Sequence, residues 1–317
     1  MKKMKLLSFL MLAMLTLVLM FSCSKDEEST ESPLVGINVI VNSDGTTSNG
    51  SLFSAIDDDN FYLDYIKYTI EEDHLIVSGY DKGGFKGIAK IASKITIKGI
   101  TYVVSKITNY SPYYGPFDYC EKMTEVIIPN SITSIGYGAF KGCTGLTSLS
   151  LPNSLTAIGE EAFSGCRGLK SITIPKSVGY IGDRAFNYTE LTSIKVESEN
   201  EAYDSRGNCN AIIEKETNTL IRGCSKTVIP NSVSSIGHWA FAGDKEIVTI
   251  TIPSSITSIG AMVFTECRNL TSMHCKCKTP PSLNPSQVGF PSTIYIPYGS
   301  LSAYKSAWGT YYNFIEE

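Results

Sequence analysis

The chain has 317 residues, a formal net charge of −4 and only 18% charged residues. This balance argues against nucleic acid as a partner, because nucleic-acid binding requires clustered Lys and Arg. The three His leave little material for His-based catalysis or metal sites, and no nucleophile motif or phosphate loop is present. We therefore expect a protein that is not an enzyme and that needs no cofactor or metal.

Residues 1–22 are typical of an export signal, with three lysines ahead of an apolar run from 6 to 20. That run is short for a membrane span, which needs about 20 apolar residues. The segment resembles a bacterial lipoprotein signal, and the acidic residues after Cys23 resemble the surface-export signal of Bacteroidetes lipoproteins. We expect lipidation of Cys23, a flexible tether over 23–33, and an outer-membrane protein that faces the cell exterior and meets the membrane only through its lipid. The alternative is a plain secretory signal with an incidental cysteine.

Residues 34–100 carry no repeat and are predicted to form an N-terminal β cap. Two runs of alternating apolar residues, 66–70 and 75–80, flank a polar turn, which is typical of a β-hairpin. Further strands are expected near 95–97 and 102–104. Arrays of repeats need such an end to cover their open core.

From residue 101 to 277 the sequence repeats. A Pro-x-Ser pair recurs, and each copy runs through an Ile-Gly pair to a Phe. The successive prolines are 23, 23, 55 and 23 residues apart, at Pro129, Pro152, Pro175, Pro230 and Pro253. Self-similarity at such a period predicts a solenoid, in which each repeat forms one coil of the stack.

Each part of one repeat has a physical reason. Leu149 and Leu151 alternate inward as in a strand, and Pro152 ends the strand because it has no N–H to donate. Gly159 permits a tight corner, after which Phe163 fills the interior. Stacked coils, about 4.8 Å apart, should align the phenylalanines in one buried column: Phe117, Phe140, Phe163, Phe186, Phe241 and Phe264.

Two departures from the repeat are candidates for specific contacts. The loop before Phe117 is rich in tyrosine and proline, and is either a binding loop or a set of capping aromatics. Its tyrosines are Tyr110, Tyr113, Tyr114 and Tyr119. The interval of 55 equals 23 plus 32, so it holds an enlarged coil, about 191–223, which contains Tyr203.

The pattern LxxLxLPxxLxxIGxxAFxxC, seen from Leu146 to Cys166, resembles the BspA-type (Treponema pallidum-like) leucine-rich repeats of bacterial surface proteins. The likeness covers roughly 101–277 and extends to the enlarged coil and to the ending over 278–317. It implies a leucine-rich repeat solenoid with parallel β-strands, short second strands or turns in each 23-residue coil, and a cap at both ends. The C-terminal cap should hold one closing strand, near 293–297, and a short helix, near 301–308.

Two repeat positions carry small polar or sulfur side chains. Serines stand where other leucine-rich repeats place an Asn ladder, so we expect a looser corner, because a hydroxyl bonds less than an amide. They are Ser131, Ser154, Ser177, Ser232 and Ser255.

The cysteines after the tether are expected to be free packed thiols, although disulfides are permitted in an exported protein. They are Cys120, Cys143, Cys166, Cys209, Cys224, Cys267, Cys275 and Cys277. The sequence His274-Cys275-x-Cys277 lacks a fourth ligand for a metal.

The outward positions of the main strands are mostly uncharged and rich in Ser and Thr. The candidates for a binding face are Ser148, Ser150, Ser171, Thr173, Lys195, Thr249 and Thr251. Solenoids use such faces for partners, although Ser and Thr also suit exposed strands in general. The resemblance implies adhesion, with a macromolecular and foremost a protein ligand such as the extracellular matrix. The alternatives are a glycan-binding accessory lipoprotein and a structural envelope protein without a specific ligand, and the oligomeric state is left open.

Overall fold

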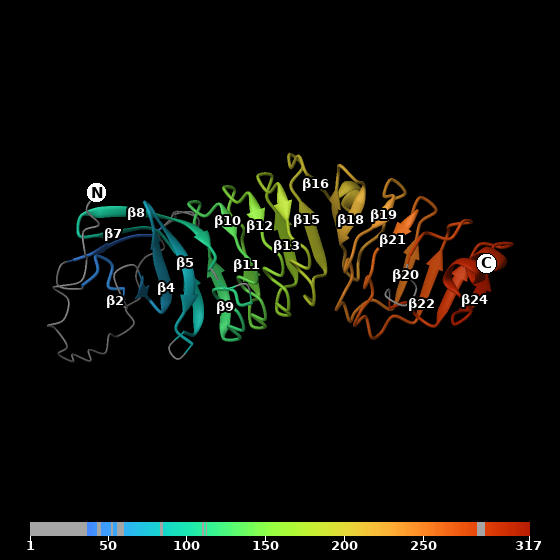
Figure 1. Ribbon diagram of the computed structural model, residues 1–317, viewed down its shortest axis with the longest axis horizontal. Coiled ribbons are helices and arrows are strands. Elements are labelled where there is room, and N and C mark those ends of the chain that lie inside the picture. The colour runs from blue at the N-terminus through green and yellow to red at the C-terminus, as the bar shows by residue number, and fades with distance from the viewer. Residues whose placement is uncertain are drawn as a thin grey trace, which may run out of the picture.

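The computed structural model describes residues 37–42, 46–51, 53–55, 60–82, 85–109, 111, 113–283 and 289–317. Successive turns of chain stack along one axis, from the N-terminal strands at one end to the C-terminal helix and last strand at the other (Figure 1). The expected export signal (1–22), the tether with Cys23, and Tyr110 lie outside the described residues. Within them, no helix has the length and apolar character to span a membrane.

The N-terminal part is built from strands that join the stack directly. The predicted hairpin is confirmed, because β4 and β5 pair antiparallel, and β7 pairs antiparallel with β8. β8 then pairs in parallel with β5 and β10, while β6 pairs with β9. The strands are β1 (Ile37–Val41), β2 (Phe53–Ala55), β3 (Asn60–Leu63), β4 (Ile66–Glu71), β5 (His74–Tyr80), β6 (Gly87–Lys90), β7 (Ala92–Ile97) and β8 (Ile100–Ile107).

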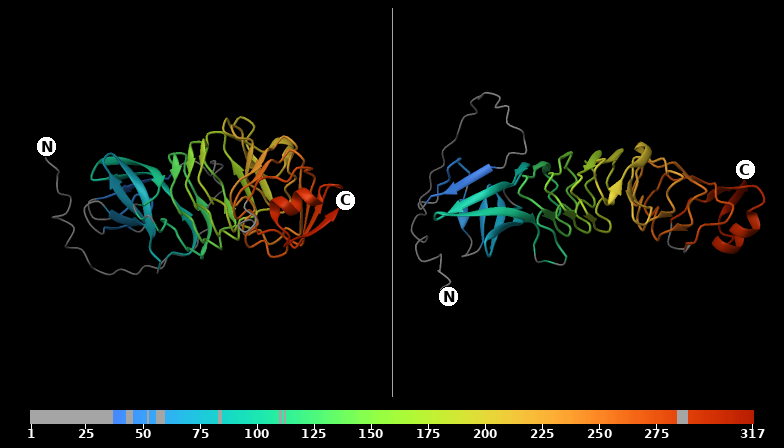
Figure 2. Two further views of the ribbon diagram at one scale, coloured as in Figure 1. Left: turned by 45° about the vertical axis from the view of Figure 1, so that its right-hand side comes forward. Right: turned by 90° about the horizontal axis from the view of Figure 1, so that it is seen from above.

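In the regular turns the main strands lie on one side of the stack and short strands of two residues on the other (Figure 2). The main strands are β9 (Met123–Ile127), β11 (Ser148–Leu149), β13 (Ser171–Ile174), β15 (Ser193–Val196), β20 (Thr249–Ile252) and β22 (Ser272–Cys275). The short strands are β10 (Ser134–Ile135), β12 (Ala157–Ile158), β14 (Tyr180–Ile181), β19 (Ser235–Ile236) and β21 (Ser258–Ile259). Neighbours pair in parallel, for example Ser134 with Ala157 and Ala157 with Tyr180, which places residues one repeat apart side by side.

The buried phenylalanines form two stacks where the sequence suggested one column. Phe117, Phe140, Phe163 and Phe186 lie with ring centroids 5.2–5.5 Å apart and planes within 5° of parallel. Phe241 and Phe264 form a second pair, 5.5 Å apart. The expectation of one continuous column is therefore wrong, because the enlarged coil supplies no ring between Phe186 and Phe241.

The enlarged coil leaves the parallel pattern. β16 (Tyr203–Asp204), β17 (Ile212–Glu214) and β18 (Thr219–Arg222) pair antiparallel, with the 3-10 helix η1 (Arg206–Asn208) after β16. β18 then pairs in parallel with β19, so the regular stack resumes. The buried residues divide into two hydrophobic clusters within this coil, where Tyr203, Ile212 and Cys224 belong to the first cluster and Cys209, Ile213 and Leu220 belong to the second.

The C-terminal end contains the predicted strand and helix, as β23 (Thr293–Ile296) and α1 (Leu301–Trp308). A further strand, β24 (Asn313–Glu316), pairs in parallel with β23 and was not predicted. Tyr304 and Trp308 of α1 are buried, and their rings lie 4.8 Å apart in an edge-to-face arrangement. The Tyr304 hydroxyl donates to the Cys277 carbonyl at 2.7 Å and Trp308 Nε1 donates to the Pro281 carbonyl at 2.9 Å, which ties α1 to the preceding turn.

We expect Phe163→Ala to lower the free energy of unfolding by about 3–5 kcal/mol, the usual cost of removing a buried ring. Phe163 is fully buried between two parallel rings. Tyr180→Ala, at a side chain 57% exposed, is the matched control and should cost about 0.5 kcal/mol or less. Urea unfolding followed by circular dichroism measures both, and an equal loss in the two variants would contradict the packing argument.

Candidate functional site

The polar strand face is exposed as the sequence predicted. In β13, β15 and β20 exposed and buried residues alternate along the strand. The candidate residues that are exposed are Ser148, Ser150, Ser171, Thr173, Lys195, Thr249 and Thr251. This face gives a partner many hydroxyl groups but few charges.

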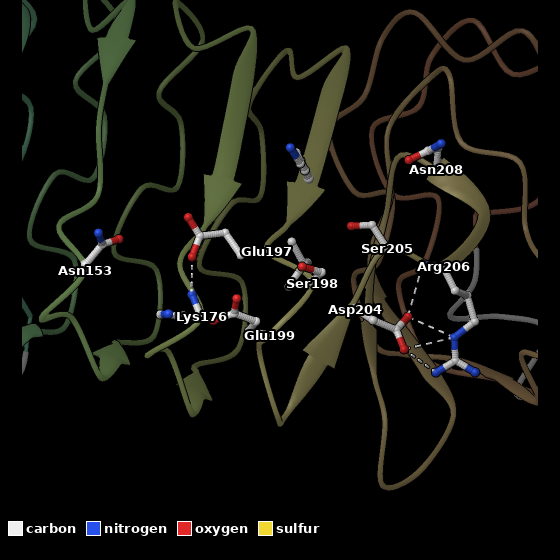
Figure 3. Close-up of a pocket in the computed structure, with 11 residues that line it drawn as sticks. Asn153, Lys176, Glu197, Ser198, Glu199, Asp204, Ser205, Arg206 and Asn208 are labelled. Carbon is white, nitrogen blue, oxygen red and sulfur yellow. Dashed lines mark hydrogen bonds and ion pairs between the residues drawn. The ribbon is translucent and has the colours of Figure 1, made fainter.

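A groove lies where this face meets the enlarged coil, and we take it as the candidate site (Figure 3). Its volume is about 650 Å³. It is lined by side chains of both charge signs, and the charged ones are Lys176, Lys195, Glu197, Glu199, Asp204 and Arg206. Asn153, Ser198, Ser205 and Asn208 also line the groove. A groove with three cations and three anions suits a partner that presents charges of both signs.

One wall of the groove carries loosely held charges. The Glu197 carboxylate accepts a hydrogen bond of 2.8 Å from the backbone N–H of Lys176. The Lys176 ammonium lies 2.6 Å from a Glu199 oxygen, and both side chains are more than half exposed. The hydrogen bond between them raises the pKa of Lys176 and lowers the pKa of Glu199. Exposed pairs of this kind are weak, so a ligand can replace either partner.

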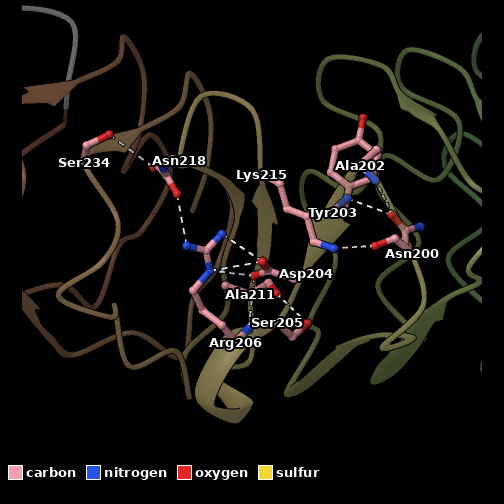
Figure 4. Close-up of polar contacts among 10 residues, drawn as sticks. All are labelled: Asn200, Ala202, Tyr203, Asp204, Ser205, Arg206, Ala211, Lys215, Asn218 and Ser234. Carbon is pink, nitrogen blue, oxygen red and sulfur yellow. Dashed lines mark hydrogen bonds and ion pairs between the residues drawn. The ribbon is translucent and has the colours of Figure 1, made fainter.

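The opposite wall is rigid. The Arg206 guanidinium binds Asp204 with Nε 2.8 Å from Oδ1 and Nη2 2.8 Å from Oδ2. Its Nη1 donates to the Asn218 side-chain oxygen at 3.0 Å (Figure 4). A two-point contact between guanidinium and carboxylate fixes the orientation of both groups. The wall therefore presents its charges in a set geometry.

Asn200 holds the chain between these two walls (Figure 4). Its Nδ2 donates to the carbonyls of Pro175 and Val178 at 2.8 and 2.9 Å. Its Oδ1 accepts from the N–H groups of Ala202 and Tyr203 at 2.9 and 2.7 Å. The side chain is 1% exposed, so all four bonds of the amide are made in the interior, where they stabilise most.

Asn200 stands one repeat after Ser177, which places an Asn in the corner position that serines occupy elsewhere. Ser154 and Ser177 each donate a single bond, to the carbonyls of Ile132 and Leu155. The hydroxyls of Ser131 and Ser255 are buried without a partner among the described residues. The serine corners thus carry fewer hydrogen bonds than the Asn200 corner, in line with the looser packing predicted for them.

Tyr203 is not available to a ligand, which corrects the expectation that it contributes to binding. Its side chain is 4% exposed, and its hydroxyl accepts a hydrogen bond from the Ile181 N–H at 3.0 Å. Burial raises the pKa of this phenol. The pairing of β16 with β17 turns Tyr203 inward, so it supports the groove from behind.

The tyrosine loop presents aromatic surface at the start of the stack. Tyr113, Tyr114 and Tyr119 are 75%, 61% and 58% exposed. The backbone N–H groups of Tyr113 and Tyr114 both donate to the Ser111 hydroxyl, at 3.2 and 3.1 Å. Their exposure favours a contact surface over buried capping aromatics. These residues precede β9, whereas the groove is lined by residues between 153 and 208, so the loop and the groove are separate surfaces.

The described cysteines pack in the interior of the stack. The eight described cysteines are buried, and none is disulfide-bonded. Cys143, Cys166 and Cys267 donate to the carbonyls of Phe117, Phe140 and Phe241, each at 3.1 Å. These thiols therefore form a ladder that links neighbouring turns beside the phenylalanine stacks.

The His274 side chain points away from the interior, whereas the Cys275 and Cys277 side chains point into it. Both cysteines are buried, whereas the His274 ring stacks on Tyr295 with centroids 4.4 Å apart. The described residues contain no group of three potential metal ligands. Cys277 instead donates to the carbonyls of Pro253 and Ile256, the same repeat positions that Asn200 binds in its own turn.

A second groove, of about 680 Å³, lies beside β20 on the far side of the enlarged coil. Thr249 and Thr251 line it together with Val228, which is 74% exposed. Among the described strands β20 pairs only with β22, so its other edge borders this groove. Two of the predicted face residues therefore lie at an open strand edge.

Sequence reasoning identified Lys195 but missed the other charged residues of the main groove. Glu197 and Glu199 were visible as an acidic run at the start of the enlarged coil, and Asp204 and Arg206 lie within it. The irregular spacing was the available signal. It marked the segment, but it did not show that Lys176 of the preceding turn faces it.

The sequence matches the family described as BspA type leucine rich repeat region, in six copies over residues 105–215 and 212–282. Among solved structures, it is similar to a leucine-rich repeat protein from Bacteroides ovatus, with 25% identity, 74% of this chain and 70% of that chain covered, and a TM-score of 0.42. A leucine rich cell surface protein from Faecalibacterium prausnitzii has 20% identity, covers 83% of this chain and 95% of its own, and has a TM-score of 0.42. The search of curated proteins found no match. Because these TM-scores are low, the family assignment rests on the sequence match.

We expect Asn200→Ala to lower the free energy of unfolding by roughly 3 kcal/mol, because buried backbone groups that lose their partners cost about 1–3 kcal/mol each. Ser177→Ala, which removes the single bond to Leu155, is the control at the equivalent position and should cost about 1 kcal/mol. Urea titration of both variants tests this. Similar losses would mean that the Asn corner is no stronger than a serine corner.

Proposed function

The chain belongs to the BspA-type leucine-rich repeat family, and from that premise we propose that it is a non-enzymatic cell-surface protein that binds a macromolecule. Leucine-rich repeats are typically protein-interaction folds, whose extended surfaces engage partners. We propose a protein ligand, such as a component of the extracellular matrix or of another microbial surface. Adhesion is then the physiological outcome of that contact.

The observation that carries this proposal is the mixed-charge groove at the edge of the polar strand face. Protein surfaces present both signs of charge, and complementary charges steer and orient a docking partner. Among the described residues none that lines this groove is aromatic, whereas stacking on aromatic rings is a common way to hold a sugar. This favours a protein over the alternative, a glycan-binding accessory lipoprotein. The tyrosine loop, with Tyr113 and Tyr114, is the second candidate contact surface.

We further propose that the protein is held at the outer membrane through lipid on Cys23 and extends outward from it.

We also propose that the N-terminal strands and the C-terminal aromatic cluster act as caps of a solenoid of 23-residue coils. Tyr80 stacks on Phe117 at one end, with centroids 5.8 Å apart. Phe290 and Trp308 lie 4.9 Å apart at the other. Covering the terminal rings keeps the open ends of a repeat array out of water.

The binding proposal is tested with a panel of extracellular-matrix proteins and a glycan array, followed by surface plasmon resonance on the best ligand. We expect a protein ligand, and an affinity loss of at least about 10-fold for Lys176→Glu with Lys195→Glu, because about 1.4 kcal/mol of lost contact is tenfold. Lys94→Glu with Lys305→Glu, at exposed positions of β7 and α1, is the charge-matched control and should bind normally.

Unchanged binding in the groove variant, with loss on replacing Tyr113 and Tyr114 by Ala, would move the site to the tyrosine loop. Binding on the glycan array alone would overturn the choice of a protein ligand. Circular dichroism of each variant checks that the fold is retained.

The anchor is tested by replacing Cys23 with Ala in cells that produce the protein. We expect the variant to leave the membrane fraction and to lose its lipid, because no other attachment is proposed. A variant that stays membrane-bound without lipid would refute the lipoprotein assignment.

A further inference from the structure

The sheet of main strands is interrupted at the enlarged coil. β15 pairs with β13 and β20 pairs with β22, but among the described strands no ladder joins β15 to β20. Elsewhere the backbone links one turn to the next at the start of a main strand, as from the Thr271 N–H to the Val248 carbonyl. Within the described part of the chain, no backbone hydrogen bond links residues 224–229 to β20. β20 therefore has one paired edge and one unpaired edge.

A threonine explains why this segment supplies no strand. Thr227 stands where the regular turns place an inward apolar residue. Its hydroxyl accepts a hydrogen bond from the Cys224 N–H at 2.7 Å and donates to the Asn210 carbonyl at 2.6 Å. The Val228 N–H donates to the Cys209 carbonyl at 3.1 Å. Such side-chain bonds to the backbone compete with a ladder, so the segment is tied to its own coil and not to β20.

The unpaired edge of β20 borders the second groove, of about 680 Å³. The carbonyls of Val248 and Ile252 accept hydrogen bonds from the turn that contains β22. Because successive residues of a strand direct their backbone groups to opposite edges, those of Thr249 and Thr251 point to the groove. Each of these two residues, which both line the groove, offers one N–H donor and one carbonyl acceptor.

This edge lacks the usual protection of an edge strand. Charged side chains, prolines and bulges commonly shield such an edge, whereas β20 has the sequence TITI and a regular register with β22. Of the described residues that line the groove, Lys276 alone is charged, and its ammonium is bound to Glu317. Val228, 74% exposed, stands on the opposite wall. The groove therefore suits an uncharged segment.

The shape of the groove selects between a folded partner and an isolated segment. Residues 227–231 line the groove opposite β20, so the unpaired edge lies inside a groove and not at an outer rim. The β20 of a second copy would bring its own residues 227–231 against that wall. An extended tail or loop, which is free along both edges, meets no such obstacle.

We propose that β20 binds an extended, uncharged peptide segment of the protein ligand as an added β-strand, in the groove between β20 and Val228. A peptide backbone supplies the alternating donors and acceptors that Thr249 and Thr251 require, as in other cases of strand addition. Residues with β-branched side chains suit this position. The inference rests on the proposed function in taking a protein as the partner, but its site is separate from the mixed-charge groove.

The probes for the test are peptides copied from main strands of this chain, residues 169–175, 191–197 and 247–253, with acetylated and amidated ends. Fluorescence anisotropy of the labelled peptides measures their binding to the full chain. We expect saturable binding of at least one peptide. Methylating its alternate backbone nitrogens should weaken binding at least about 10-fold, because this removes N–H donors and keeps the side chains.

Variants of the protein test the position of the site. Val228→Lys should weaken peptide binding at least about 10-fold, because it places a charge in an uncharged groove. Val103→Lys, at another exposed valine, is the matched control and should bind normally. Thr251→Pro removes a donor that faces the groove and should also weaken binding, since proline is tolerated where the N–H of an edge strand has no partner. If Thr251→Pro fails to fold, Val228→Lys decides.

No saturable binding of any of the peptides, equal binding of the methylated form, or equal binding by Val228→Lys would each overturn the proposal. A dimer in sedimentation equilibrium that Val228→Lys dissociates would make a second copy the occupant and overturn the choice of a peptide segment. Peptide binding without any matrix-protein ligand would uphold this site while the proposed function fails. Binding of a matrix protein with no peptide binding would have the reverse meaning.

Discussion

The fold depends on the contact between each buried phenylalanine ring and the rings of the turns before and after it. Rings 5.2–5.5 Å apart and almost parallel run through the first half of the stack. One turn has a single apolar face and cannot bury it alone, so stability comes from neighbours. The close approach at the corner serves the same contact, since a Cβ on Gly159 would lie 2.6 Å from the backbone of Gly136. A turn without a ring must fill the interior by other means.

The enlarged coil is the turn that lacks a ring, and it differs from the regular turns both inside and outside. Inside, Arg222 and Gly223 replace the Ala-Phe pair and bring polar groups into the interior beside Thr189 and Asn187. Outside, the antiparallel excursion of β16, β17 and β18 raises a wall that carries Asp204 and Arg206. The regular turns are scaffold, and the interruption supplies one wall of the groove on the strand face.

Local patterns explain which elements the sequence could predict. The β4–β5 hairpin and the outward positions of β13, β15 and β20 follow from alternation along one strand, which needs no knowledge of the partner. β24 was missed because Asn313–Glu316 has no buried face of its own and becomes a strand by pairing with β23. Tyr203 was expected at the surface, but its direction is set by pairing with β17. The single phenylalanine column was wrong because the enlarged coil supplies no ring between Phe186 and Phe241.

The sequence by itself determined the period, the strand face, the corner residues and the family, because neighbours in a regular repeat lie one period apart. The tertiary structure decided what surrounds the 32-residue interruption. In that segment the 23-residue period no longer predicts which residues are neighbours. Only the folded chain shows that Lys176 and Arg206 line the same groove, and that Arg222 contacts Thr189, 33 residues away. The binding surfaces proposed for this protein arise from contacts between segments of unequal length, which no repeat encodes.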